Sequence, residues 1–211
     1  MLSRIEEVAL IPVIRAPSPE LALAAVEAIV DGGISIFEIT LTVPGAVQVI
    51  ERLVKRLGAR AVIGAGTVLT PEQARACLDA GAEFVVSPGL DLPTLELVLK
   101  ADIAGIPGAL TPTEVITAWH AGADIVKIFP CSAMGGPPYL KSLKGPFPQV
   151  PLLPSGGVTT ATAHEYLEAG AVALGIGSEL VAADALSNGQ LSVISERARE
   201  LVSAVRRARS S

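Results

Sequence analysis

One pattern repeats along most of this chain: a short apolar run, a turn, an amphipathic stretch and then a glycine. The apolar runs are rich in Val, Ile, Leu, Phe and Ala, and runs of about four to eight such residues are typical of strands buried on both faces of a parallel sheet. We therefore predict eight strands, at Val8–Ile14, Ser35–Thr40, Ala61–Gly66, Phe84–Pro88, Asp102–Pro107, Ile125–Pro130, Pro151–Gly156 and Ala171–Gly177.

The stretches between these runs begin with sequences that cap helices. Ser18-Pro19, Thr70-Pro71 and Thr111-Pro112 each place a hydroxyl at the N-cap and a proline at the first helical position. Gln73 and Glu114 follow their threonines by three residues, which predicts two capping boxes. Most of the stretches end in glycine, which accepts the left-handed conformation that closes a helix. The pattern therefore predicts strands that alternate with helices.

Eight parallel strands alternating with helices predict a single-domain (β/α)8 barrel. An open doubly wound sheet is the alternative, but it would need a glycine-rich dinucleotide-binding turn after its first strand, and Ile14-Arg15-Ala16-Pro17 is not one. A chain of 211 residues lies near the small end for a barrel. We predict one domain over residues 1–211, with a core over about 8–181 and a C-terminal helix over about 191–208.

Composition and charge argue against several classes of protein. The net charge of −5 and an aromatic content of 3% do not fit a nucleic-acid-binding protein. The apolar runs are interrupted by Gly, Pro or charge before they reach the length of a membrane span. Glu6 and Glu7 do not suit an export signal, and two cysteines form no disulfide framework. We therefore expect a cytoplasmic protein.

Lys127 is the most informative residue, because it is the only one of five lysines that lies inside a predicted strand. Strand alternation places Ile125, Lys127 and Phe129 on one face, and Val126 and Ile128 on the other. If the second face packs on helices, Lys127 points into the barrel. A neutral amine there could attack a carbonyl and form a Schiff base. The alternative is a purely structural, buried ion pair.

Glu38 is the natural partner for that ion pair. It lies in the second predicted strand and shares a face with Ile36 and Thr40. A carboxylate in this position can also take up and return a proton as a general base and acid. Arg15 follows the first strand and so lies at the same C-terminal end of the barrel, where the active sites of such barrels form.

Glycine-rich turns follow the last two predicted strands, at Ser155-Gly156-Gly157 and Gly175–Ser178. Glycines let backbone N–H groups approach an anion, a following helix N-terminus adds positive potential, and barrels often hold a phosphate here. The alternative is two tight turns without a ligand. No metal site is evident, because His120 and His164 are far apart, and Cys131 lacks an evident histidine partner.

Seven short motifs together resemble the 2-keto-3-deoxy-6-phosphogluconate (KDPG) aldolase family. Each motif is short, but their order and spacing from about Ile11 to Val181 are specific. The motifs are Phe37–Thr42, Gly64–Leu69, Val86–Gly89, Ile106–Gly108, Val126–Pro130, Lys144–Phe147 and Pro154–Val158.

The resemblance implies a class I aldolase that needs no metal or other cofactor and is commonly a homotrimer. The implied reaction is the reversible cleavage of KDPG, a phosphorylated keto-deoxy sugar acid, to pyruvate and D-glyceraldehyde 3-phosphate. Lys127 would form the Schiff base and Glu38 would act as the general acid and base. The substrate would contact Arg15, Thr67, Pro88, Phe129 and Ser155, and its phosphate Gly156, Gly157, Gly177 and Ser178.

The chain departs from the family at two places. Many members have threonine where this chain has Ser155, and some have arginine within the stretch that here reads Thr40–Val43. These differences bear on the choice between the gluconate and galactonate forms. The alternatives are the 6-phosphogalactonate epimer or 4-hydroxy-2-oxoglutarate as substrate, another phosphate-binding barrel such as an isomerase or phosphosugar epimerase, or a phosphosugar-binding barrel without activity. Independently of the family, a mean hydropathy of +0.54 predicts apolar surface that would favour self-association.

Overall fold

In the computed structural model, which describes residues 2–210, short parallel strands form two sheets. The larger sheet has the order β5-β4-β3-β2-β1-β9, and the smaller has the order β6-β7-β8. The strands are β1 (Leu10–Ile14), β2 (Ile36–Thr40), β3 (Val62–Gly66), β4 (Phe84–Val86), β5 (Ala104–Ile106), β6 (Gly108–Ala109), β7 (Val126–Ile128), β8 (Leu152–Pro154) and β9 (Leu174–Ile176).

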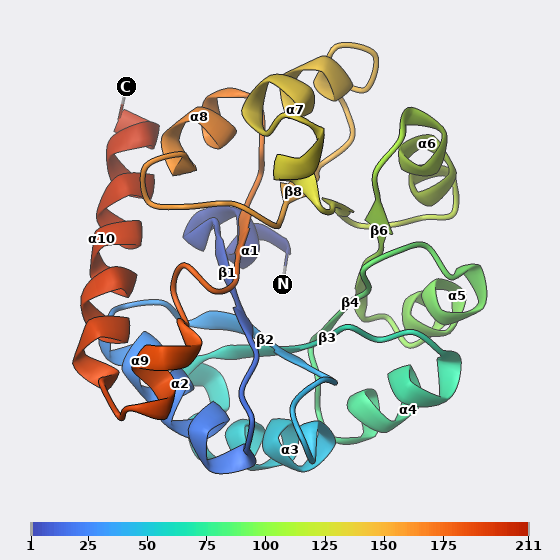
Figure 1. Ribbon diagram of the computed structural model, residues 1–211. Coiled ribbons are helices and arrows are strands. Elements are labelled where there is room, and N and C mark those ends of the chain that lie inside the picture. The colour runs from blue at the N-terminus through green and yellow to red at the C-terminus, as the bar shows by residue number, and fades with distance from the viewer. Residues whose placement is uncertain (1, 211) are drawn as a thin grey trace.

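The two sheets join into one closed barrel (Figure 1). β5 lies within the predicted strand Asp102–Pro107, and β6 follows directly after that strand's predicted end. Only Pro107, which has no N–H to donate, separates β5 from β6. At the other junction, isolated parallel bridges connect Leu152 with Ala171 and Ser155 with Gly175, which links β8 to β9. The arrangement confirms the predicted (β/α)8 barrel, with its fifth strand split in two.

Helices surround the barrel and connect its strands (Figure 1). They are α1 (Leu2–Val8), α2 (Pro19–Asp31), α3 (Ala46–Leu57), α4 (Pro71–Asp79), α5 (Leu92–Lys100), α6 (Pro112–His120), α7 (Pro137–Lys144), α8 (Ala163–Glu168), α9 (Ala183–Ser187) and α10 (Leu191–Ser210), with short 3-10 turns η1 (Gly58–Arg60) and η2 (Cys131–Met134). No helix within residues 2–210 combines the length and the apolar character that crossing a membrane would need.

The helix caps follow the sequence, with one exception. Thr111 and Glu114 form the predicted capping box of α6, and the backbone N–H groups of Thr111 and Leu110 lower the pKa of the Glu114 carboxyl. At α4, Thr70 accepts from the N–H of Gln73 as predicted. The Gln73 side chain, however, accepts from Leu69 N at 2.8 Å and not from the N–H of the N-cap residue Thr70. The prediction of a second capping box is therefore wrong.

The first predicted strand begins too early, because Val8 belongs to α1 and not to β1. Leu2, Ile5 and Val8 are spaced by three residues, which places them on one face of a helix. Ile5 is fully buried in a cluster with the barrel-interior side chains, against which Leu2 and Val8 also pack. The other members of this cluster are Ile11, Ile36, Val62, Phe84, Val86, Ile106, Ile125, Leu153 and Ala173. α1 therefore packs against the barrel interior, below the layer that carries the charged residues.

Candidate active site

Lys127 and Glu38 face each other inside the barrel. Lys127 Nζ lies 3.6 Å from Glu38 Oε1, and their side chains are 6% and 2% exposed. The predicted alternation is confirmed, because Val126 and Ile128 pack in the cluster between strands and helices, while Ile125 packs in the barrel interior. The ammonium nitrogen also lies 5.4 Å from the centroid of the Phe129 ring.

The Glu38 carboxylate has space only because β3 ends in a glycine. A Cβ at Gly66 would lie 2.7 Å from Glu38 Oε1, closer than real Cβ atoms approach their neighbours. Within residues 2–210, Oε1 is buried and has no hydrogen-bond partner. Buried carboxylate oxygens normally accept hydrogen bonds. An oxygen without one, beside a buried lysine, is available to exchange a proton with a bound molecule.

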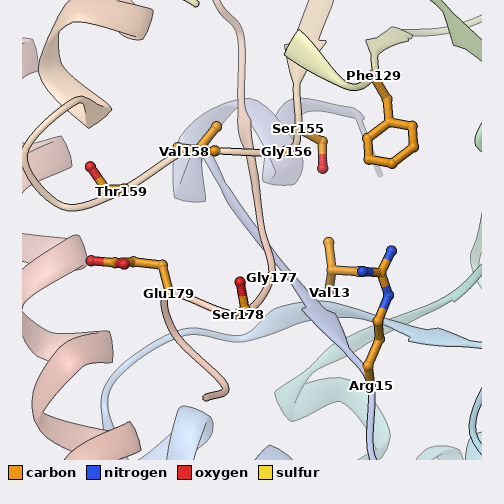
Figure 2. A pocket seen from close by; sticks show the side chains of 11 residues that line it. Val13, Arg15, Phe129, Ser155, Gly156, Val158, Thr159, Gly177, Ser178 and Glu179 are labelled. Carbon is orange, nitrogen blue, oxygen red and sulfur yellow. The ribbon is translucent and has the colours of Figure 1, made fainter. Parts of the chain in front are cut away.

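A cavity of about 150 Å³ opens at the C-terminal ends of the strands. Neither Lys127 nor Glu38 lines it, but Phe129, whose ring the Lys127 nitrogen approaches, does. In Figure 2, Arg15 extends from the end of β1 toward Ser155 and Phe129, and the Ser178 side chain lies across the cavity from Ser155. Seven of the predicted site residues line this cavity: Arg15, Phe129, Ser155, Gly156, Gly157, Gly177 and Ser178. The fold thus brings the two glycine-rich turns together with a cation from a distant part of the chain.

The Ser155-Gly156-Gly157 turn needs its glycines. Gly156 and Gly157 have φ values of 83° and 80°. A Cβ at Gly157 would also lie 2.3 Å from Ser132 Oγ. The following helices, however, begin only at Ala163 and Ala183, so the helix N-terminus that we expected at these turns is not there. Backbone N–H groups and Arg15 remain as the groups that could face an anion.

Four of the predicted site residues do not line this cavity: Lys127 and Glu38, which lie within β7 and β2, and also Pro88 and Thr67. Pro88 lines a neighbouring cavity of about 360 Å³, and Phe129 lines both. Thr67 follows β3 with a φ of 58° and lines neither.

Sequence reasoning missed four residues that line the first cavity: Val13, Val158, Thr159 and Glu179. Strand alternation places Val13 on the same face as Arg15, and Val158 and Thr159 directly follow the glycine turn. These two sequence patterns could have identified three of the four residues. The Glu179 carboxylate points away from Arg15 in Figure 2.

The remaining candidate groups lie elsewhere. His164 pairs with Glu168 on α8, and His120 is exposed at the end of α6. Cys131 is fully buried, and burial raises the pKa of its thiol, which disfavours the reactive thiolate. Over the part of the chain that the structure describes, no three His, Cys, Asp or Glu side chains gather where they could hold a metal ion.

The sequence model described as KDPG and KHG aldolase matches residues 1–197 of this chain. The chain belongs to this family. It is 39% identical over 192 residues to the KHG/KDPG aldolase of Escherichia coli K12, which covers 91% of this chain and 90% of that protein. It is also 39% identical over 172 residues to the 2-dehydro-3-deoxy-6-phosphogalactonate aldolase of the same organism, covering 81% and 83%.

A solved structure of a family member has the same fold as this chain. A KDPG aldolase from Legionella pneumophila, described with pyruvate captured as a covalent carbinolamine, superposes with a TM-score of 0.88 at 35% identity. The match covers 95% of this chain and 98% of that one. Membership of the family assigns aldolase chemistry, and therefore a lyase, to this chain.

Proposed function

We propose that this chain is a class I aldolase that reversibly cleaves KDPG to pyruvate and D-glyceraldehyde 3-phosphate, without a metal or other cofactor. The observation that carries the proposal is the buried pair of Lys127 and Glu38, 3.6 Å apart inside a barrel whose C-terminal end holds a cavity lined by Phe129, the neighbour of Lys127. The covalent pyruvate described for the Legionella relative supports it, since a carbinolamine precedes a Schiff base.

In the proposed reaction, the neutral amine of Lys127 attacks the C2 carbonyl of the substrate. Loss of water from the carbinolamine leaves an imine, whose positive nitrogen draws electrons from the C3–C4 bond. Glu38 takes the proton of the C4 hydroxyl as that bond breaks and the aldehyde leaves. Glu38 then returns a proton to C3 of the enamine, and water releases pyruvate from Lys127.

The two ends of the substrate are proposed to bind on opposite sides of the reacting carbons. The turns at Gly156–Gly157 and Gly177–Ser178 bind the phosphate through backbone N–H groups. Arg15 and Ser155 bind toward the keto-acid end, together with Thr67, Pro88 and Phe129. The chain is equally identical, at 39%, to an E. coli phosphogalactonate aldolase, which makes the 6-phosphogalactonate epimer the second candidate substrate.

Borohydride trapping tests the mechanism. Incubation with pyruvate and borohydride should add one reduced pyruvate to the peptide that contains Lys127. Lys127→Met should abolish both the adduct and turnover. Lys100→Met should change neither, because Lys100 is an exposed lysine paired with Glu96 on α5. Turnover should persist in EDTA. A barrel that only binds phosphosugars would give no adduct and no pyruvate from either epimer or from 4-hydroxy-2-oxoglutarate.

A further inference from the structure

Thr40 carries a buried hydroxyl that the proposed reaction does not use. It is the last residue of β2 and is 0% exposed. Its Oγ1 donates to the carbonyl oxygen of Ile14, the last residue of β1, at 2.9 Å. The same Oγ1 lies 2.7 Å from Thr42 Oγ1. Three groups at the mouth of the barrel are therefore connected in one short chain.

The direction of this chain of hydrogen bonds follows from its inner end. A carbonyl oxygen can only accept, so the single hydroxyl proton of Thr40 points to Ile14. The second hydrogen bond must then run from Thr42 to Thr40. The order is Thr42 to Thr40 to the Ile14 carbonyl, and each hydroxyl is fixed in one rotational state.

The Ile14 carbonyl belongs to the same planar peptide unit as the N–H of Arg15. A hydrogen bond that holds the carbonyl therefore also holds the orientation of the peptide plane that leads to the Arg15 Cα. Arg15 itself makes no ion pair or side-chain hydrogen bond within residues 2–210, and it is the one Lys or Arg side chain among the cavity-lining residues. Within the described residues, the guanidinium group is therefore positioned only through its own backbone.

We infer that Thr40, supported by Thr42, is a positioning residue for Arg15, and that this pair of hydroxyls aims the guanidinium group at the acidic substrate. The inference rests on the proposed function, because it assumes that Arg15 binds the substrate. It assigns a role to the two hydroxyls of the stretch Thr40–Val43. Here the cation comes from β1, and β2 supplies the hydroxyls that hold it.

A double-mutant cycle tests this role. Thr40→Val keeps the shape of the side chain and removes the hydroxyl. It should raise the KM for the phosphorylated substrate by about five- to thirtyfold, because the Ile14 carbonyl loses its side-chain hydrogen bond and only the pairing of Ile14 with β2 still holds this peptide unit. The kcat should change much less, since a contact made equally in ground and transition states affects KM alone. Thr40→Ser should restore the KM.

The decisive measurement is the same substitution in an Arg15→Ala background. There Thr40→Val should change KM by less than about twofold, because coupled residues are not additive. Thr94→Val is the matched control, since Thr94 is a buried threonine on α5 whose hydroxyl pairs with Asp91. Its effect on KM should be small in both backgrounds, even if it lowers the melting temperature.

Additive effects of Thr40→Val and Arg15→Ala, or an unchanged KM, would overturn the inference. If Thr40→Val does not fold, the same double-mutant cycle can be measured with Thr42→Val, because Thr42 is exposed. Thr42→Val should raise the KM by about two- to fivefold. Additive effects of Thr42→Val and Arg15→Ala would equally overturn the inference. The borohydride adduct of the unaltered chain separates the two proposals. With the adduct present, additivity removes only the role of Thr40. Without it, the proposed function fails and this inference fails with it.

Discussion

At the residue scale, Glu38 allows proton transfer to be separated from imine formation. Glu38→Gln keeps the shape of the side chain and removes the proton carrier. We expect pyruvate still to be trapped on Lys127, while turnover falls by about a hundred- to ten-thousandfold, the usual contribution of general acid–base catalysis. Borohydride trapping measures imine formation, turnover measures the whole reaction, and deuterium exchange at the pyruvate methyl group measures the proton transfer. Exchange at the normal rate in Glu38→Gln would show that another group moves the proton.

Gly66 provides a second test at this scale, because its missing side chain makes room for the Glu38 carboxylate. A Cβ at Gly66 would lie 2.8 Å from Glu38 Cδ as well as 2.7 Å from Oε1. Gly66→Ala should therefore displace Glu38 and lower turnover by up to about a hundredfold, as a misplacement of about 1 Å can do. Gly145→Ala is the control, since Gly145 is exposed with a helical φ of −54°. Wild-type turnover in Gly66→Ala would show that the carboxylate position does not matter.

At the scale of elements, we expect helix α1 to contribute to stability but not to activity. Ile5 on this helix is 0% exposed and packs with the barrel interior. Ile5→Ala should lower the free energy of unfolding by about 2–5 kcal/mol, because it leaves a cavity in a closed apolar cluster. Activity below the melting temperature should be kept, since the proposed catalytic residues, Lys127 and Glu38, are not part of that apolar cluster. Urea unfolding followed by circular dichroism measures the change, and a loss below about 1 kcal/mol would contradict the packing role.

At the scale of the whole molecule, we predict self-association as a homotrimer. The number three comes from the family resemblance, and the surface supplies the physical reason. Leu69, Leu92, Ile116 and Met134 are exposed by 52%, 50%, 38% and 44%, so large apolar side chains remain on the surface of the single chain. Sedimentation should show a species of about three times 21.6 kDa. A single species near 21.6 kDa at micromolar protein would contradict the prediction.

Local patterns were sufficient for much of this protein, because they depend on neighbours in sequence. Buried parallel strands must be apolar, helices need caps at their ends, and the two-residue repeat of a strand decides which side chains share a face. These rules predicted the barrel and placed Lys127 and Glu38 on its inner face without any tertiary information.

Other features depend on elements that are distant in sequence, so only the tertiary structure decided them. The strand that splits at Pro107 and the helix α1 that packs on the barrel interior both follow from how the barrel closes. The same is true of the contact of Gly66 with Glu38, which requires β2 and β3 to pair in one register. Arg15 meets the glycine turns only because β1 pairs with β9, and no local pattern encodes that pairing.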